Sequence, residues 1–307
     1  MTGSSTPPPA PKTSVAPPEP FGARLRRAMD TRGPLCVGID PHAGLLSRWG
    51  LPFDPSGLER FALTVVEALG EHTAVFKPQS AFFERFGSRG VAVLEKTVAR
   101  AREAGALVLM DAKRGDIGST MDAYAATYLA PGAPLFSDAL TVSPFLGFGS
   151  LRPALDAARA AGTGVFVLAL TSNPEGGQVQ RATAADGRSV AQVMLDAVAA
   201  ENEGAAPLGS VGAVVGATLA EAGADLAVNG PLLAPGVGAQ GATPADLPAL
   251  FGAVLPNVLP SVSRDVLRHG PDPAALLKSV REYVAEVRAA VDGAAAPGGI
   301  AGRSAGR

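Results

Sequence analysis

Short apolar runs alternate with longer amphipathic stretches over most of the chain. The apolar runs are typical of buried strands and lie at residues 35–39, 74–76, 106–110, 139–142, 164–170, 211–215, 232–234 and 258–260. Apolar residues at helical spacing occupy stretches between and after them, at residues 56–70, 90–105, 119–128, 149–162, 189–203 and 275–291. Strands that alternate with helices predict a parallel sheet, and eight such runs match the number that closes a (β/α)8 barrel.

The main alternative to a barrel is an open, doubly wound sheet. Such a sheet usually carries a glycine fingerprint directly after its first strand. Here the first run leads instead into GIDPH at residues 38–42. The sequence therefore favours a single-domain α/β protein with a (β/α)8 TIM barrel over residues 21–291.

Both ends of the chain differ in composition from this body. Residues 1–20 hold seven prolines and almost no large apolar side chains, and residues 292–307 are rich in glycine and alanine. Segments of this kind bury too little apolar surface to offset the entropy of ordering them. We expect a disordered proline-rich tail at 1–20 and a flexible tail at 292–307. The first segment also lacks the apolar region of a secretory signal.

Composition argues against several classes of function. The 307 residues carry a net charge of −2, so bulk charge does not suggest binding to nucleic acid or to an anionic membrane. One cysteine, Cys36, excludes an internal disulfide and a cysteine-cluster metal site, and we expect it in the core. The scattered histidines are expected at loops or helix ends without a role: His42, His72 and His269. No apolar run reaches the roughly 18 residues of a membrane span, so we expect a soluble, cytoplasmic protein.

The densest group of charged residues follows the third apolar run. Asp111, Lys113 and Asp116 come directly after residues 106–110, and Lys77 ends the second run. In a barrel, the carboxyl ends of all strands share one rim, where active sites lie. If strand geometry persists, Asp111 and Lys113 point to the same side, so the rim would gather two ammonium and two carboxylate groups. The alternative is an Asp–Lys pair on a surface loop, which the position after an apolar strand disfavours.

Other strand ends deliver residues suited to binding a ligand. The first ends at Asp40, which suits a ligand hydroxyl or an Asp-Pro turn, and the fourth ends at Ser143, which suits a polar ring edge or a turn. The seventh and eighth lead into the glycine-rich loop 235–241 and to Arg264. Barrels often bind phosphate at these two places, and an arginine there adds charge-assisted hydrogen bonds.

The charged cluster lies in a segment, DAKRGDIG at 111–118, that resembles the D-x-K-x-x-D-I motif of the orotidine 5′-phosphate decarboxylase family. Six further segments resemble that family in its order: CVGIDPH (36–42), FKPQSAFFERFG (76–87), TVSPFLGFGS (141–150), LALTSNPEG (168–176), APGVGAQG (234–241) and LPSVSR (259–264). The FKPQ and TSNP portions are most similar to the bacterial branch found in mycobacteria and their relatives. The two tails lie outside the resemblance.

The resemblance implies a homodimeric barrel that makes UMP and CO2 from orotidine monophosphate without a metal or an organic cofactor. It implies that Lys113 protonates C6 of the pyrimidine, and that Asp111 flanks the substrate carboxylate. Asp116 would be contributed by the partner subunit and complete a charged array with Lys77. The remaining positions would bind substrate: Asp40 and Lys77 the ribose, Ser143 the pyrimidine, Gln240 and Arg264 the phosphate, with Thr120, Pro235 and Gly241 also at the site. Loop 236–241 would form part of a lid.

Two other functions remain open from the sequence. A metal-dependent sugar-phosphate decarboxylase or synthase of the same barrel group resembles this chain at D-x-K-x-x-D, but it would use an acidic metal ligand where this chain has Lys77. A non-catalytic nucleotide-binding barrel would be free to lose Asp111 or Lys113, and both are present. The segment 171–188 has no assignment.

Overall fold

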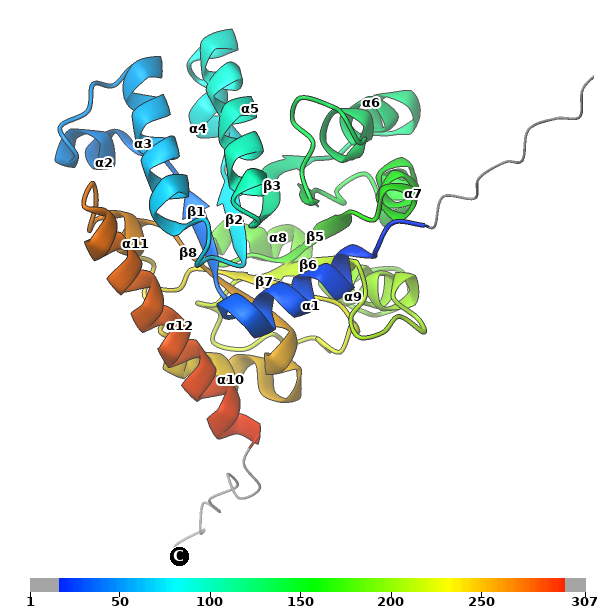
Figure 1. Ribbon diagram of the computed structural model, residues 1–307. Coiled ribbons are helices and arrows are strands. Elements are labelled where there is room, and N and C mark those ends of the chain that lie inside the picture. The colour runs from blue at the N-terminus through cyan, green and yellow to red at the C-terminus, as the bar shows by residue number, and fades with distance from the viewer. Residues whose placement is uncertain (1–16, 296–307) are drawn as a thin grey trace, which may run out of the picture.

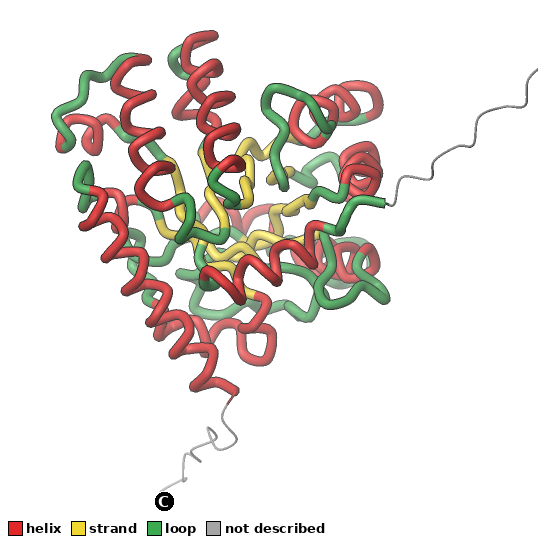
Figure 2. Tube along the Cα trace, viewed as in Figure 1, coloured by secondary structure: helices red, strands yellow, loops and turns green. Residues whose placement is uncertain are grey.

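The structure of the protein is a computed structural model that describes residues 17–295. Within them, eight strands pair in parallel in the order β1 to β8, and β1 (Cys36–Ile39) closes the barrel against β8 (Val258–Val262). Helices surround the central strands, as Figure 1 and Figure 2 show. The predicted (β/α)8 barrel is therefore confirmed. Most of the two predicted tails, residues 1–16 and 296–307, lie outside the described residues.

Every predicted strand and helix overlaps an observed one. The remaining strands are β2 (Val75–Pro78), β3 (Leu107–Arg114), β4 (Ala139–Val142), β5 (Gly164–Leu170), β6 (Val211–Val215) and β7 (Leu232–Pro235). The α-helices are α1 (Phe21–Arg32), α2 (Ala43–Arg48), α3 (Pro55–Leu69), α4 (Ser80–Glu84), α5 (Gly87–Glu103), α6 (Gly118–Leu129), α7 (Arg152–Ala161), α8 (Gly177–Gln180), α9 (Val190–Glu201), α10 (Leu247–Phe251), α11 (Arg264–Leu267) and α12 (Pro273–Ala295). Short 3-10 segments lie at η1 (Phe148–Leu151), η2 (Pro174–Gly176), η3 (Pro244–Asp246) and η4 (Gly252–Asn257). In this part of the chain, no helix combines the length and the apolar character needed to cross a membrane.

Helix α3 shows how the outer helices form and where they pack. The Asp54 carboxylate accepts hydrogen bonds from the backbone N–H groups of Ser56 and Gly57, at 2.8 and 3.0 Å, and so caps the first turn. Pro55 then occupies a position where a missing N–H costs nothing. One face of the helix is buried in the layer between helices and strands: Leu58, Phe61, Ala62, Val65, Val66 and Leu69. Local capping and apolar spacing thus agree on one helix and one buried face.

Helix α1, which the apolar pattern did not predict, lies across one end of the barrel (Figure 1). Phe21, Leu25 and Met29 are four residues apart, so they share one helix face and fill the barrel interior. The Phe21 ring meets Phe166 edge to face, with ring centroids 6.0 Å apart. A Cβ at Gly164 would lie 2.3 Å from the Phe21 ring, so only glycine leaves room for this closure. Arginines lie between these apolar positions, so the sequence pattern did not predict a helix here.

Alternation along the strands decides which side chains face the barrel interior. Val75 of β2 and Leu109 of β3 belong to the interior core. Successive strand residues point to opposite faces, so the residues two positions further on, Lys77 and Asp111, point the same way. The interior is therefore apolar near the amino ends of these strands and charged near their carboxyl ends.

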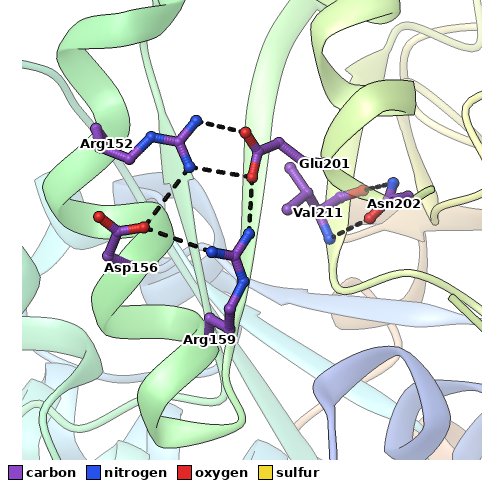
Figure 3. A network of polar contacts seen from close by, with 6 residues as sticks. All are labelled: Arg152, Asp156, Arg159, Glu201, Asn202 and Val211. Carbon is purple, nitrogen blue, oxygen red and sulfur yellow. Dashed lines mark hydrogen bonds and ion pairs between the residues drawn. The ribbon is translucent and has the colours of Figure 1, made fainter. Parts of the chain in front are cut away.

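A separate charged network fastens α7 to α9 and is shown in Figure 3. Glu201 of α9 accepts hydrogen bonds from Arg152 and Arg159 of α7, the latter at 3.0 Å. The neighbouring Asn202 side chain donates to the backbone oxygen of Val211 at 2.7 Å and accepts from its N–H at 3.1 Å. Because Val211 begins β6, this network joins two helices to the amino end of a strand.

Candidate active site

Lys77, Asp111 and Lys113 form a continuous chain of charges at the carboxyl ends of β2 and β3. Lys77 Nζ lies 2.9 Å from Asp111 Oδ2, and Lys113 Nζ lies 2.6 Å from Asp111 Oδ1. The side chains of Lys77 and Asp111 are buried, whereas that of Lys113 is partly exposed. One buried carboxylate therefore holds two ammonium groups, of which that of Lys113 is the more exposed to solvent.

The backbone of β3 is irregular where it carries Lys113. Pairing with β4 shifts register between Met110 and Arg114, and Lys113 has a φ of 48°. A positive φ is uncommon for a residue with a side chain and marks local strain. The predicted strand ended at residue 110, but the observed one continues to Arg114 through this bulge. Asp111 and Lys113 do meet, as expected, although regular strand alternation is not the reason.

Two polar side chains that the sequence did not single out hold this chain of charges in place. The Thr141 hydroxyl donates to Asp111 Oδ1 at 2.9 Å and accepts the backbone N–H of Lys113 at 3.0 Å. With its amide oriented to satisfy its neighbours, Gln79 donates to Asp111 Oδ2 at 2.8 Å and accepts from Lys113 Nζ at 3.2 Å. Both lie in the quoted family segments, but a lone threonine or glutamine carries no chemical signature in a sequence.

Electrostatic interactions within the Lys77–Asp111–Lys113 group keep its two buried side chains, Lys77 and Asp111, ionised. Burial disfavours the ammonium of Lys77, but the carboxylates of Asp111 and Asp40 outweigh it and hold the pKa of Lys77 above its ordinary value. Burial likewise disfavours the Asp111 carboxylate, but Lys77 and Lys113 outweigh it and hold the pKa of Asp111 well below its usual range. At neutral pH the buried pair therefore carries both charges.

A cavity of about 250 Å³ adjoins the charged chain and extends to the ends of β7 and β8. It brings five of the predicted site residues to one wall: Asp40, Lys77, Pro235, Gln240 and Arg264. Asp40 Oδ1 and Ser263 Oγ, both on this cavity, are buried and find no hydrogen-bond partner within residues 17–295. Since unpaired buried polar atoms are costly, these two atoms suit a ligand that carries hydroxyl groups.

The glycine-rich loop after β7 is ordered by its own hydrogen bonds. Gly238 N–H donates to the oxygen of Ala242 at 2.8 Å, and Gly241 N–H donates to the oxygen of Gly238 at 2.8 Å. Gly236, Gly238 and Gly241 all have positive φ, which explains the glycines. Gln240 is exposed on this loop, and Arg264 is exposed at the start of α11. The two predicted phosphate ligands thus project from neighbouring strand ends.

Other predicted site residues lie outside these contacts. Asp116 is partly exposed and accepts the backbone N–H of Ile117 at 2.8 Å, and Thr120 is exposed in the first turn of α6. Ser143 follows β4, where its N–H donates to the oxygen of Arg114 at 2.8 Å. Gly241 is exposed next to Gln240. Within residues 17–295, Lys113 forms its ion pair with Asp111 and not with Asp116.

The single cysteine lies in the core, and the three histidines lie near helix ends. Cys36 is fully buried in the interior core, and burial raises the pKa of its thiol to about 12. His42 directly precedes α2, His72 lies three residues after the end of α3, and His269 lies two residues after the end of α11. His42 also lines the cavity beside Asp40, which the sequence did not suggest. Among residues 17–295, no three His, Cys, Asp or Glu side chains are grouped to hold a metal ion.

Known proteins resemble the chain over nearly the whole barrel. Residues 33–280 match the family described as orotidine 5′-phosphate decarboxylase / HUMPS. The chain belongs to this family. An orotidine 5′-phosphate decarboxylase of Streptomyces coelicolor is 70% identical over 274 residues, which are 89% of this chain and 99% of that protein. The family suggested by the sequence motifs is therefore confirmed.

Solved structures agree with this membership. One from Streptomyces avermitilis has a TM-score of 0.89 and 71% identity, covering 90% of this chain and 97% of its own. The OMP decarboxylase of Leishmania donovani has a TM-score of 0.69 and 32% identity, covering 88% of this chain and 99% of its own. The barrel fold is thus shared with a family member that is only 32% identical to this chain.

Proposed function

We propose that the protein decarboxylates orotidine 5′-monophosphate to UMP and CO2, a step of de novo pyrimidine biosynthesis. The observation that carries the proposal is the Lys77–Asp111–Lys113 chain, placed beside a cavity that ends at Arg264. The name of the 70% identical relative supports the same reaction. An ammonium at one end and a phosphate ligand at the other suit a substrate that is a nucleoside monophosphate with a carboxylate on its base.

Lys113 is the proposed proton donor. Decarboxylation breaks the bond between C6 and the carboxylate carbon and leaves the electron pair on C6, where no adjacent carbonyl can delocalise it. A fixed ammonium stabilises this charge in a site that excludes water. Lys113 Nζ then transfers one proton to C6, and the neutral amine regains a proton from solvent. Asp111 keeps Lys113 aimed at C6, and its charge lies beside the departing carboxylate.

The rest of the site binds the substrate. Asp40 and Lys77 hold ribose hydroxyls, which would satisfy the unpaired Asp40 Oδ1. Ser143 contacts the pyrimidine, and Gln240 and Arg264 bind the phosphate. The other proposed contacts are Thr120, Pro235 and Gly241. Binding of the distant phosphate can close loop 236–241 over the substrate.

Asp116 is proposed to act in the site of the other subunit of a homodimer. A mixture of two inactive variants tests this arrangement. Lys113→Ala and Asp116→Ala homodimers should each be nearly inactive. Hybrid dimers should regain activity, because one of their two sites then holds both native residues. Failure of the mixture to regain any activity, with hybrid dimers present, would show that Asp116 does not act across subunits.

A cytoplasmic location stays a prediction.

The ultraviolet absorbance of orotidine monophosphate, followed with purified protein in EDTA, tests the function directly. We expect a rapid change that the chelator does not affect. Unchanged absorbance together with tight UMP binding would favour a non-catalytic nucleotide-binding barrel. Turnover of sugar phosphates only when Mg²⁺ is added would favour the metal-dependent sugar-phosphate enzymes.

A further inference from the structure

The short helix α11, which begins with Arg264, depends on its neighbours for its position. Four residues are far too few for a helix to be stable alone, so tertiary contacts must hold it. On one side, the indole N–H of Trp49 donates to the backbone oxygen of Leu267 at 2.9 Å in a buried hydrogen bond. A Cβ at Gly270 would lie 1.9 Å from the same indole, so the chain after α11 packs directly on Trp49.

Tyr283 of α12 holds the other side of α11. Its hydroxyl donates to Asp265 Oδ2, and Arg268 Nη1 lies 3.0 Å from Asp265 Oδ1. Asp265 is the residue directly after Arg264, so a contact that fixes Asp265 also limits where the Arg264 side chain starts. Burial and the nearby Asp265 carboxylate raise the pKa of Tyr283, so its hydroxyl keeps the proton that it donates.

The same two side chains touch the glycine-rich loop. A Cβ at Gly238 would lie 2.8 Å from Tyr283 Oη and 2.9 Å from Asp265 Cβ. Gly238 also has a φ of +82°, and both of its backbone polar groups are bonded within the loop. Tyr283 and Asp265 thus lie where the loop after β7 contacts α11.

We propose that Tyr283 is a positioning residue for the phosphate end of the site. Through Asp265 it sets the position of Arg264, and through its contact with Gly238 it sets the loop that carries Gln240. It acts through these groups and does not touch the substrate. The inference rests on the proposed phosphate site at Gln240 and Arg264, and it adds a residue that lies outside the cavity lining.

The test compares Tyr283→Phe with the unmodified protein, using ligands that do and do not carry phosphate. Tyr283→Phe removes one hydroxyl and keeps the ring. We expect the KM for orotidine monophosphate to rise about tenfold with kcat within about twofold, because one hydrogen bond that orders a binding group is lost. The inhibition constant of UMP should rise by the same factor. The inhibition constant of uridine, which lacks phosphate, should not change.

Two further variants make the outcome decisive. Thr97→Val removes another buried hydroxyl, one that donates to Val93 O in α5, and should leave both inhibition constants unchanged. Arg264→Ala should weaken UMP strongly. If Arg264→Ala leaves UMP inhibition unchanged, the phosphate site is wrong and the role of Tyr283 falls with it. If Arg264→Ala weakens UMP but Tyr283→Phe does not, or weakens UMP and uridine equally, only the role of Tyr283 is overturned.

Discussion

The two ends of the site are built in different ways. At the charged end, strands present buried side chains, and Asp111 is bonded to three neighbours within the protein: Lys77, Lys113 and Thr141. At the phosphate end, loops present exposed side chains, Gln240 and Arg264, on segments held by their neighbours. Groups that must stabilise a developing charge benefit from being fixed in advance. Groups that capture a ligand must stay accessible to solvent. Substitutions at the two ends should therefore change different kinetic constants.

The largest effect is expected at the charged end, from Lys113→Ala. Loss of the ammonium removes both the stabilisation of charge at C6 and the proton donor, so kcat should fall by at least about a thousandfold. The absorbance assay at saturating orotidine monophosphate measures this loss. Lys96→Ala, which removes an exposed lysine paired with Glu59 on α3, is the control and should retain normal turnover. Near-normal turnover by Lys113→Ala would contradict the assignment.

The next effect is expected at the phosphate end, from Arg264→Ala. An arginine that binds phosphate through charge-assisted hydrogen bonds contributes about 2–3 kcal/mol, so kcat/KM should fall about a hundredfold. Most of the loss should appear in KM, in contrast to Lys113→Ala. Arg281→Ala removes an exposed arginine of α12 and should change neither constant. If Arg264→Ala lowers kcat and leaves KM unchanged, the proposal that the phosphate end acts through substrate binding is wrong.

A smaller effect is expected from the hydroxyl that joins Asp111 to the backbone of Lys113. Thr141→Val keeps the shape of the side chain but removes its hydrogen bonds to Asp111 and to the Lys113 N–H, so kcat should fall about tenfold with little change in KM. Thr141→Ser restores the hydroxyl and should recover most of the rate. Equal losses in the valine and serine variants would show that Thr141 matters through packing alone.

Sequence patterns predicted the barrel well because strand and helix periods differ, and the shared rim of the strand ends then placed Lys77 near Asp111 and Lys113. The position of Lys113 was less predictable, because it depends on a bulge and a positive φ that the pattern of apolar and polar residues does not indicate. Gln79 was missed because its role exists only through contact with Asp111 and Lys113. Helix α1 was missed because arginines interrupt its apolar face. The proposed role of Asp116 involves a second subunit, which a single chain does not contain.

The smallest expected effect is a pH dependence of stability that arises at the charged end alone. Lys77 and Lys113 hold the pKa of Asp111 below the unfolded value of about 3.9. The stabilisation from its ionised form is therefore complete above about pH 4 and is lost as pH falls through the lower folded pKa. Lys77, whose pKa is raised, stays charged and contributes equally throughout this acidic range.

Urea unfolding of the native protein and of Asp111→Asn, measured between pH 7 and pH 3, isolates this contribution. Other carboxylates are present in both proteins, so their effects largely cancel in the difference. The native protein should be the more stable at pH 7, because Asp111→Asn leaves buried Lys77 without its partner. That advantage should shrink below about pH 4, because Asp111 then takes up a proton in the unfolded chain while it stays ionised in the folded protein. A constant difference across the whole range would mean that the carboxylate supports the fold through shape and hydrogen bonding, and that its charge serves only the ligand.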